Sequence, residues 1–453
     1  MSWLRTHIRT FHASRRTFII GILTLMERLY HYLWKTGIRG SEFKDVDGAE
    51  IEVIDPGVHN NDAGPDFFNS KLKINGIEWV GNVEIHVKAS DWFRHGHSED
   101  PAYNNVILHV VGISDKRVNR SDGTIIPQIE LTFPEKFFRT YASLAGGADT
   151  VRCSSMLPGL PDLNKSDWLE SLSVERMQQK AGRVKEINKA TDGDWEQTCL
   201  ILLARGLGFG LNGDPFELLG KSVPLRVLHH HSDNLFQLEA LLFGQAAMLD
   251  STMFIFDEYY QSLCREYYFL ARKYGLKPLS PGIWKYSRTR PQNFPHRRIA
   301  FLAESALGGF SLFSRLLENS RDSESLTSVF DMKAEGYWQN HFSFDTQVSK
   351  VPTELSKSSR LLLVINVAIP LLYAYAAATG NVELGERMVG IIQDLPAENN
   401  MIVRQWQNLG FIVKDASRSQ ALIHLKKEYC DKKKCIYCRF GHHFLRQSAL
   451  RED

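Results

Sequence analysis

Residues 59–92, HNNDAGPDFFNSKLKINGIEWVGNVEIHVKASDW, decide the fold of the first part of this chain. Apolar and polar residues alternate along two segments of it, 67–74 and 77–87, and such alternation predicts β-strands. The dipeptide Asn75-Gly76 lies between them. This pair is typical of a two-residue hairpin turn, because both turn positions need positive φ. The stretch therefore predicts an antiparallel β-hairpin.

One face of the second strand carries polar side chains. Side chains alternate across a strand, so Glu84, His86 and Lys88 share one face and the apolar residues between them share the other. We expect the apolar face to meet a core and the polar face to lie opposite, near Asp66. Two carboxylates on adjacent strands, Asp66 and Glu84, form an oxygen-rich site suited to Mg²⁺ or Mn²⁺. His86 or Lys88 would then assist the attacking water.

The order Pro65-Asp66, hairpin and Glu84-Ile85-His86 resembles the pattern of the restriction-endonuclease-like, or PD-(D/E)XK, nucleases, with His where Lys is usual. GPDFFNSKL, GNVEIHVKASDW and AYNNVILHVV are similar to segments of an uncharacterised bacterial family, domain of unknown function 2851. This resemblance extends from about Met26 to the C-terminus. It implies a restriction-endonuclease-like α/β domain, and it carries no established reaction. The expected function is metal-dependent hydrolysis of phosphodiester bonds in DNA or RNA.

Other interpretations of this stretch remain open. Asp66 follows a Gly-Pro pair and is also typical of a turn, while Glu84 fits an exposed position on a half-buried sheet. A protein that keeps the fold without efficient chemistry would be an adaptor that binds nucleic acid or protein. A further alternative is a hydrolase of a non-nucleic substrate that uses His86, His95 and His97, for which Zn²⁺ or Fe²⁺ is expected.

Length and composition indicate a soluble globular protein with two or three domains. The 453 residues carry a net charge of only +2, so bulk charge gives no argument for nucleic acid and any basic surface must be local. Six cysteines do not make a disulfide scaffold in a chain of this length. A reducing compartment, the cytoplasm, is therefore expected. Composition leaves the oligomeric state open.

Changes in composition and periodicity along the chain indicate the domain boundaries. The first 25 residues contain four arginines, no acid and the short apolar run FIIGILTL. A signal or transit peptide is one interpretation, and an extension from a misassigned start, with Met26 as the natural beginning, is the preferred one. The expected regions are this extension (1–25), an α/β domain (26–142), a linker (143–163), an α-helical domain (164–427) and a Cys-rich tail (428–453).

Helical periodicity dominates after the expected linker. The apolar run 361–378 is barely long enough to span a bilayer, so we expect a buried helix that is bent or broken at Pro370, and no membrane. Further helices are expected at 27–36, 168–190, 195–206, 234–249, 257–273 and 296–317, and further strands at 50–54, 106–111 and 125–133.

The segment 284–298, WKYSRTRPQNFPHRR, combines basic and aromatic residues. Basic groups pair with phosphates and aromatic faces stack on unpaired bases, so this segment is a candidate nucleic-acid-binding element. The alternative is a loop held by its two prolines, in which the arginines satisfy helix ends and carboxylates. The candidate binding residues are Lys285, Arg288, Arg290, Arg297 and Arg298.

The C-terminus carries a C-x4-C-x2-C motif formed by Cys430, Cys435 and Cys438. Thiolates at this spacing close around Zn²⁺ when a fourth ligand is present, for which His442 is the nearest candidate. The same spacing occurs in iron–sulfur proteins, where the fourth cysteine is distant. Three unliganded thiols in a basic tail are the remaining alternative. The cysteines available as a distant ligand are Cys153, Cys199 and Cys264.

Overall fold

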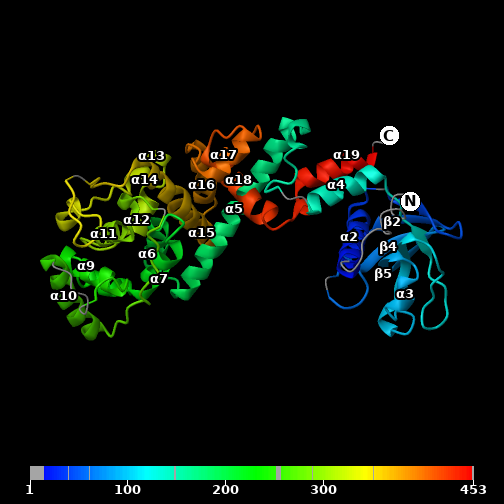
Figure 1. The fold of residues 1–453 in the computed structure, drawn as a ribbon, viewed down its shortest axis with the longest axis horizontal. Helices are drawn as coiled ribbons and strands as arrows, with labels where there is room; N and C mark the ends of the chain where they lie inside the picture. Colours follow the sequence, from blue (N-terminus) through cyan, green and yellow to red (C-terminus); the bar gives the residue numbers. More distant parts are fainter. Residues whose placement is uncertain are drawn as a thin grey trace. The chain divides into compact units, whose positions relative to one another are not determined.

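The computed structural model describes residues 15–38, 40–60, 62–146, 149–250, 257–287, 289–349 and 351–450. The chain divides into two compact units, which are described separately (Figure 1). Unit 1 is Met1–Pro161 together with Lys427–Asp453, and unit 2 is Asp162–Lys426. A mixed sheet lies in unit 1 and unit 2 is mostly helical, as the sequence predicts.

Unit 1 is built on one mixed sheet whose order is β1-β2-β4-β5-β6-β7, with β3 paired to β4. Neighbouring strands are antiparallel from β1 to β5, whereas β5, β6 and β7 are parallel. The bounds are β1 (Glu42–Lys44), β2 (Glu50–Asp55), β3 (Val58–His59), β4 (Phe67–Ile74), β5 (Ile77–Lys88), β6 (Val106–Ile113) and β7 (Gln128–Glu130).

The predicted hairpin is confirmed as β4 and β5. Ile74 pairs with Ile77, and the two turn residues between them, Asn75 and Gly76, have φ of 48° and 83°. A parallel neighbour cannot follow a tight turn, so the chain leaves β5 through a crossover before it enters β6. This crossover contains α3 (Asp91–Arg94) and folds back over the sheet.

Both faces of β5 are covered, which differs from the predicted division into a core face and an open polar face. Val83 and Ile85 are fully buried, and Glu84 and His86 are only 5% and 2% exposed. The reason is the crossover, which packs Trp92 and Tyr103 over the polar face.

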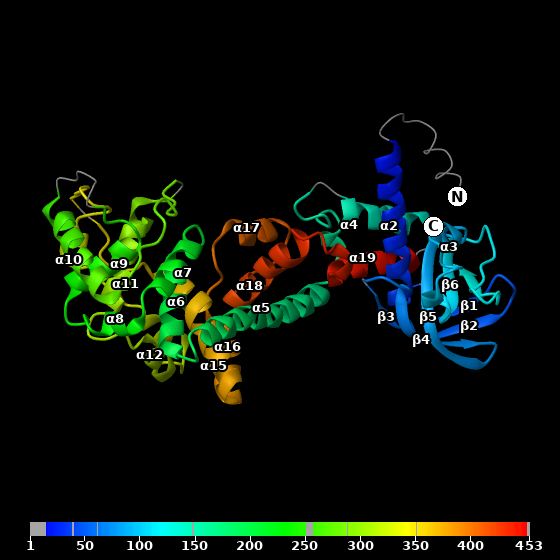
Figure 2. The same ribbon diagram turned by 90° about the horizontal axis from the view of Figure 1, so that it is seen from below.

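Helix α2 (Arg15–Thr36) packs against β5, as Figure 2 shows, and buries Leu29 and Leu33. It begins upstream of the helix expected at 27–36. Residues 1–14 of the expected extension lie outside the described residues, whereas 15–25 are part of α2.

Unit 2 has one large core, lined by apolar side chains of nearly all its helices. Asp194 and Asp257 accept hydrogen bonds from the first turns of α6 and α10, which fixes where these helices begin. The helix expected at 296–317 is two helices, because Gly308 and Gly309 adopt φ of 75° and 101°. The bounds are α5 (Asp162–Ala190), α6 (Trp195–Leu207), α7 (Gly213–Ser222), α8 (Leu225–His229), α9 (Leu235–Gln245), α10 (Glu258–Tyr274), α11 (Pro295–Ser305), α12 (Leu312–Glu318), α13 (Ser323–Ser328), α14 (Lys357–Leu363), α15 (Ile369–Thr379), α16 (Val382–Asp394), α17 (Met401–Asn408) and α18 (Ala416–His424).

The apolar run expected to bend or break at Pro370 forms a continuous helical path. A π-helical turn, Val364–Ala368, joins α14 to α15, and Pro370 occupies the first turn of α15. Pro370 donates no backbone N–H to this path, and the π-helical turn lies immediately before it. The path from Lys357 to Thr379 is long and apolar enough to cross a membrane by length and composition, but 61% of its most apolar window is buried, as in a core helix.

The C-terminal segment returns to unit 1. Its helix α19 (Arg439–Leu450) and the short turn η7 (Cys435–Tyr437) both pack on α4 (Glu135–Gly146). The segment expected as a linker, 143–163, contains the end of α4 and the short helix η2 (Leu157–Gly159).

Substituting alanine for Gly112 should destabilise unit 1 by about 1–3 kcal/mol, because the added Cβ overpacks the contact between β6 and α2. That atom would lie 2.0 Å from the Tyr30 hydroxyl oxygen. Urea unfolding measures the loss, and the change should cost much less in a Tyr30→Leu background if this contact is its cause. Gly182→Ala, where no atom lies within 4 Å, is the control.

Candidate metal centre

The structure brings the carboxyl groups of Asp66 and Glu84 together. The backbone N–H of Asp66, just before β4, donates to Glu84 Oε2 at 3.1 Å. Asp66 Oδ2 in turn accepts from the backbone N–H of Ile85 at 2.9 Å and lies 3.3 Å from His31 Nε2. The Oδ2 atom of Asp66 is thus occupied by protein groups, while Glu84 presents its other oxygen, Oε1, to a cluster of histidines.

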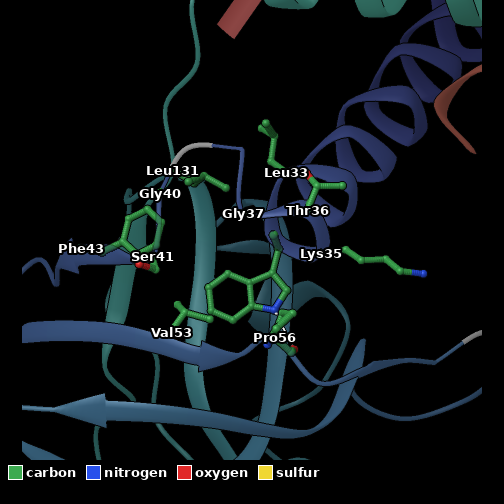
Figure 3. A pocket seen from close by; sticks show the side chains of 11 residues that line it. Leu33, Lys35, Thr36, Gly37, Gly40, Ser41, Phe43, Val53, Pro56 and Leu131 are labelled. Atoms are coloured by element: carbon green, nitrogen blue, oxygen red, sulfur yellow. Dashed lines mark hydrogen bonds between the residues drawn. The ribbon is translucent and has the colours of Figure 1, made fainter. Parts of the chain in front are cut away.

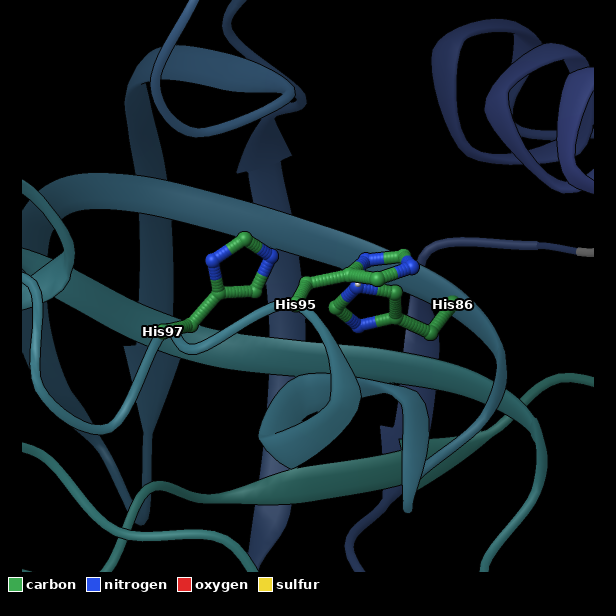
Figure 4. Close-up of side chains that lie close together, drawn as sticks. All are labelled: His86, His95 and His97. Carbon is green, nitrogen blue, oxygen red and sulfur yellow. Dashed lines mark hydrogen bonds between the residues drawn. The ribbon is translucent and has the colours of Figure 1, made fainter.

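Glu84 Oε1 lies 3.3 Å from His97 Nε2 and 3.5 Å from His86 Nε2, and His86 Nε2 lies 3.2 Å from His95 Nδ1. One nitrogen from each histidine lies within 4.8 Å of the others. Figure 4 shows the rings of His86 and His95 against each other and that of His97 beside them. Two ligands about 2.1 Å from one ion in tetrahedral geometry are ~3.4 Å apart. The observed spacings suit ligands of a single ion.

A chain of hydrogen bonds fixes the tautomer of His86. Gln128 Nε2 faces the carbonyl oxygen of Lys116 at 3.3 Å, so Gln128 Oε1 is the atom that faces His109 Nδ1 at 3.1 Å. His109 Nδ1 therefore donates, and its Nε2 accepts from His86 Nδ1 at 2.8 Å. The proton of His86 resides on Nδ1, and its Nε2 lone pair points toward Glu84 and His95. Metal-binding histidines are commonly oriented through their second nitrogen in this way.

Burial keeps these groups neutral in the absence of a cation. Burial first, and the charge of Asp66 second, raise the pKa of Glu84 to about 9. Burial also lowers the pKa values of His86, His95 and His97, and it lowers that of His109 to about 4. Neutral imidazole is the form that binds metal, and a cation at this point would displace the Glu84 proton.

The crossover holds one side of the cluster rigidly and leaves the other side open. The ring of His97 stacks on Tyr103 at 3.8 Å and meets the edge of Trp92. His95, in contrast, is exposed, and the neighbouring side chain of Arg94 is 62% exposed. Solvent therefore has access from the side of His95.

Helix α2 contributes groups that the sequence analysis missed. His31 contacts Asp66, and its Nδ1 lies 3.3 Å from His59 Nε2. Burial lowers the pKa of His31, but its hydrogen bond to Asp66 and the charge of Asp66 outweigh burial and raise the pKa above the ordinary value. Glu27, one helical turn before His31, faces the same region. The i, i+4 spacing of Glu27 and His31 is the only local signal of this role.

Two further residues were predicted to assist the attacking water. Lys88 is exposed at the end of β5, where its backbone N–H donates to Asp91 Oδ2 at 3.3 Å, so it lies at the edge of the site. His86 is central and uses Nδ1 to reach His109, so its Nε2, which faces Glu84 and His95, suits metal binding better than proton transfer.

The predicted nucleic-acid-binding residues fall into two groups. Arg297 and Arg298 are buried in α11: Arg297 donates to the carbonyl oxygens of Trp338 and Pro352, and the guanidinium of Arg298 lies 4.5 Å from the centre of the Phe209 ring. These contacts favour the structural alternative for both arginines. The side chains of Lys285 and Arg290 are exposed and fit a surface that meets phosphates, whereas Arg288 lies outside the described residues.

The tail cysteines are reduced and lie in unit 1. Cys438 is buried, Cys430 and Cys435 are half-buried, and none of the three is in a disulfide. The predicted fourth ligand, His442, places its Nδ1 2.7 Å from the Tyr32 hydroxyl of α2. This nitrogen is therefore engaged in a contact with α2.

A separate hollow of about 170 Å³ lies beside the C-terminal end of α2 (Figure 3). Its described lining is mostly apolar, with Leu33, Phe43 and Leu131 around it, and Lys35 is the only charged residue there. The hollow lacks the donor groups that surround Glu84, so it is not part of the candidate metal centre.

Comparison with known proteins identifies a family. A family model described as "Protein of unknown function (DUF2851)" matches residues 27–401. The match includes the whole candidate metal centre and ends before the tail cysteines, although the sequence resemblance was expected to reach the C-terminus. No curated protein and no solved structure matches the chain.

The metal-free protein should lose stability relative to Glu84→Gln as pH rises from about 4.5 to about 9. The pKa of Glu84 is raised on folding, so the folded state binds this proton more tightly than the unfolded state does. The proton therefore contributes its full stability at a pH below the ordinary pKa of glutamate, and this contribution is lost as the pH rises to the raised pKa. Chemical unfolding in the presence of a chelator measures the free energy of unfolding of both proteins. The difference between them should change with pH by up to ~1.4 kcal/mol per pH unit. Parallel curves would mean that Glu84 is ionised in the empty site.

Arg297→Ala should destabilise unit 2 by about 2–5 kcal/mol, because the carbonyl oxygens of Trp338, which is buried, and Pro352 would lose their donor. Arg290→Ala, at an exposed position, should change stability by less than about 0.5 kcal/mol. Thermal unfolding compares the two variants. If Arg297→Ala proved neutral, the buried guanidinium would not be structural.

Proposed function

We propose that this chain, which belongs to the family described as Protein of unknown function (DUF2851), is a metal-dependent hydrolase that cleaves phosphodiester bonds of a nucleic acid. The observation that carries the proposal is the convergence of Glu84 Oε1 with nitrogens of His86, His95 and His97 at spacings that suit ligands of one ion. The histidines are neutral, which is the form that binds metal, and the buried carboxyl group of Glu84 would release its proton when a cation binds. This combination of groups therefore favours a metal site.

The order of elements supports a restriction-endonuclease-like fold for unit 1. An acidic residue precedes β4, a second one lies inside β5 of the same hairpin, and a helix-containing crossover leads to the parallel strand β6. This is the arrangement expected from the Pro65-Asp66 and Glu84-Ile85-His86 motif. His86 stands where that motif usually has Lys, and the free nitrogen of its ring makes it a ligand instead.

The donor set favours a transition metal over Mg²⁺. Imidazole suits Zn²⁺ and Fe²⁺, whereas Mg²⁺ prefers sites made of oxygen alone. Mn²⁺ accepts carboxylate readily, so a site with Glu84 and several histidines should bind Mn²⁺, Fe²⁺ or Zn²⁺ more tightly than Mg²⁺. The Mg²⁺ expected from the two carboxylates is less favoured because Asp66 Oδ2 is occupied by Ile85 and His31.

Each residue has a separate part in the reaction. A bound divalent ion lowers the pKa of a water ligand and polarises a phosphoryl oxygen. Glu84, His86, His95 and His97 would hold the ion, and His109 orients His86. His95 is the exposed member of this set. Arg94 and Lys88, both exposed nearby, supply the positive charge that a phosphodiester requires.

A second candidate is a hydrolase of a non-nucleic substrate with the same metal centre. The burial of Arg297 and Arg298 favours it, because they are two of the five residues expected to meet phosphates. A non-catalytic adaptor that binds nucleic acid or protein is the third candidate. The second candidate differs from the nuclease in the substrate that is cleaved and not in the metal that is bound, whereas the adaptor cleaves no substrate.

Glu84→Gln and His97→Gln should abolish hydrolysis and weaken binding of Mn²⁺ or Zn²⁺, because each removes a ligand. His109→Phe should weaken metal binding by about 10–100-fold through the loss of the hydrogen bond that orients His86. His230→Gln, at an exposed position of unit 2, is the matched control. Calorimetric metal titration and cleavage of single- and double-stranded DNA and RNA are the measurements.

Each outcome of these assays has a defined meaning. Metal binding with cleavage of a generic ester, but of no nucleic acid, would replace the nuclease with the second candidate. Binding of nucleic acid without cleavage under any metal would favour the adaptor. Equal metal affinity in wild-type protein, Glu84→Gln and His97→Gln would remove the metal centre itself.

A further inference from the structure

The outer face of α10 in unit 2 carries exposed aromatic and basic side chains. Tyr268 and Phe269 are 66% and 61% exposed, although rings of this size usually contribute their area to a core. Arg265, Arg272 and Lys273 are exposed on the same helix. These five positions follow a helical spacing of i, i+3, i+4, i+7 and i+8, which places them on one face. We call them the α10 stripe.

The opposite face of α10 anchors the helix in the core of unit 2. Helix α10 packs on α9 (Figure 1), and the Tyr267 hydroxyl donates to Gln245 Oε1 at 2.8 Å. The residues of α10 that are buried on this side are Tyr260, Leu263, Tyr267 and Leu270. The core therefore does not use the two rings of the α10 stripe.

The guanidinium groups of the α10 stripe are not neutralised by acids. Arg265 donates to the Ser262 hydroxyl at 2.9 Å, and the guanidinium carbon of Arg272 lies 5.8 Å from the centre of the Tyr268 ring. In the part of the chain that the structure describes, neither guanidinium forms an ion pair with a carboxylate. Both arginines can therefore pair with an external anion.

The acids of α10 lie at the edge of the stripe or beyond it. Glu266 is half-buried and accepts from Gln237 Nε2 at 2.7 Å, so it has a partner within unit 2. Glu258 lies in the first turn, about 10 Å along the helix axis from Arg265. Past the C-terminal end of the helix, the exposed Lys277 adds a further positive charge. The charge of this surface therefore suits a polyanion.

We propose that the α10 stripe binds single-stranded nucleic acid, with the two rings stacked on unpaired bases and the three cations paired with phosphates. Proteins that bind single strands without reading their sequence combine aromatic faces and basic groups on one surface in this way. The choice of ligand rests on the nucleic-acid hydrolase proposed above. The stripe adds that the strand bound by unit 2 is single.

Other ligands fit this surface less well. A helix that lies in a membrane interface buries a broad apolar face in the lipid, whereas the apolar face of α10 is in the core of unit 2. Two copies of the chain that met through the stripe around a twofold axis would bring like charges together. A protein partner would accept other apolar side chains in place of Tyr268 and Phe269, whereas stacking requires a ring.

The first test is binding of labelled poly-dT and poly-U oligonucleotides to the full-length protein in the presence of a chelator. The chelator keeps the candidate metal centre empty, so binding is measured separately from cleavage. Tyr268→Leu combined with Phe269→Leu should weaken binding at least about fivefold, because apolar area is kept but stacking is lost. Tyr268→Phe keeps the ring and should bind as the wild-type protein does. A duplex of the same strand with its complement should bind more weakly than the single strand.

The second test is a salt titration of the same binding. For a single strand, the slope of log affinity against log salt concentration is about 0.7 for each phosphate contact. Arg272→Ala combined with Lys273→Ala should therefore make the slope shallower by about 1.4. Lys185→Ala combined with Lys189→Ala, at exposed positions of α5, is the matched control and should leave affinity and slope unchanged.

The outcomes separate the α10 stripe from the hydrolase. Binding that depends on the rings, without cleavage when metal is supplied, would keep the stripe and remove the nuclease. Cleavage of a nucleic acid with normal binding in both stripe variants would overturn the stripe and keep the nuclease. Wild-type protein that binds no oligonucleotide, or that binds phosphatidylserine vesicles through these residues instead, would also overturn the stripe.

Discussion

The structure of unit 1 depends on a buried carboxyl group. Glu84 lies in the middle of β5, a strand covered on both faces, where an isolated charge would cost several kcal/mol. The backbone N–H of Asp66 satisfies one of its oxygens, and histidine nitrogens approach the other. Asp66, just before β4, His97 of the crossover and His86 of β5 are the partners that surround this group.

The two acids of the site, Asp66 and Glu84, have different surroundings and therefore different roles. Asp66 Oδ2 accepts from the Ile85 backbone and contacts His31, whose raised pKa favours the charged form, so Asp66 remains the paired acid. Glu84 is buried more deeply, and burial together with the charge of Asp66 raises its pKa, so it retains its proton until a cation arrives. The two carboxyl groups thus differ in depth, with side chains 21% and 6% exposed, and in the groups beside them, which is how one site holds both a structural and a reactive acid.

Local sequence signals predicted the hairpin well, because Asn75-Gly76 and the alternation around it act over a few residues. They did not predict that the crossover would cover Glu84, since that depends on how Trp92 and Tyr103 pack after a parallel strand forms. His95 and His97 looked like a weak pair in a loop, and only the approach of His86 from β5 makes them a set. The same limit applies to Cys153, because the neighbouring Cys435 and Cys438 come after all of unit 2 in the sequence. It also applies to Arg297, whose side chain donates to carbonyl groups of Trp338 and Pro352 far along the chain.

The return of the C-terminal segment to unit 1 has a consequence for biosynthesis. During translation the sheet of unit 1 leaves the ribosome first, but α19, which packs on α4, is made only after all of unit 2. At a synthesis rate of about 5–20 residues per second, this delay is on the order of tens of seconds. The apolar surface of α4 is exposed during that interval, while unit 2 has a continuous chain and folds without waiting. The nascent protein therefore passes through a stage with one finished unit and one unfinished one, and a chaperone that covers α4 would act at that stage.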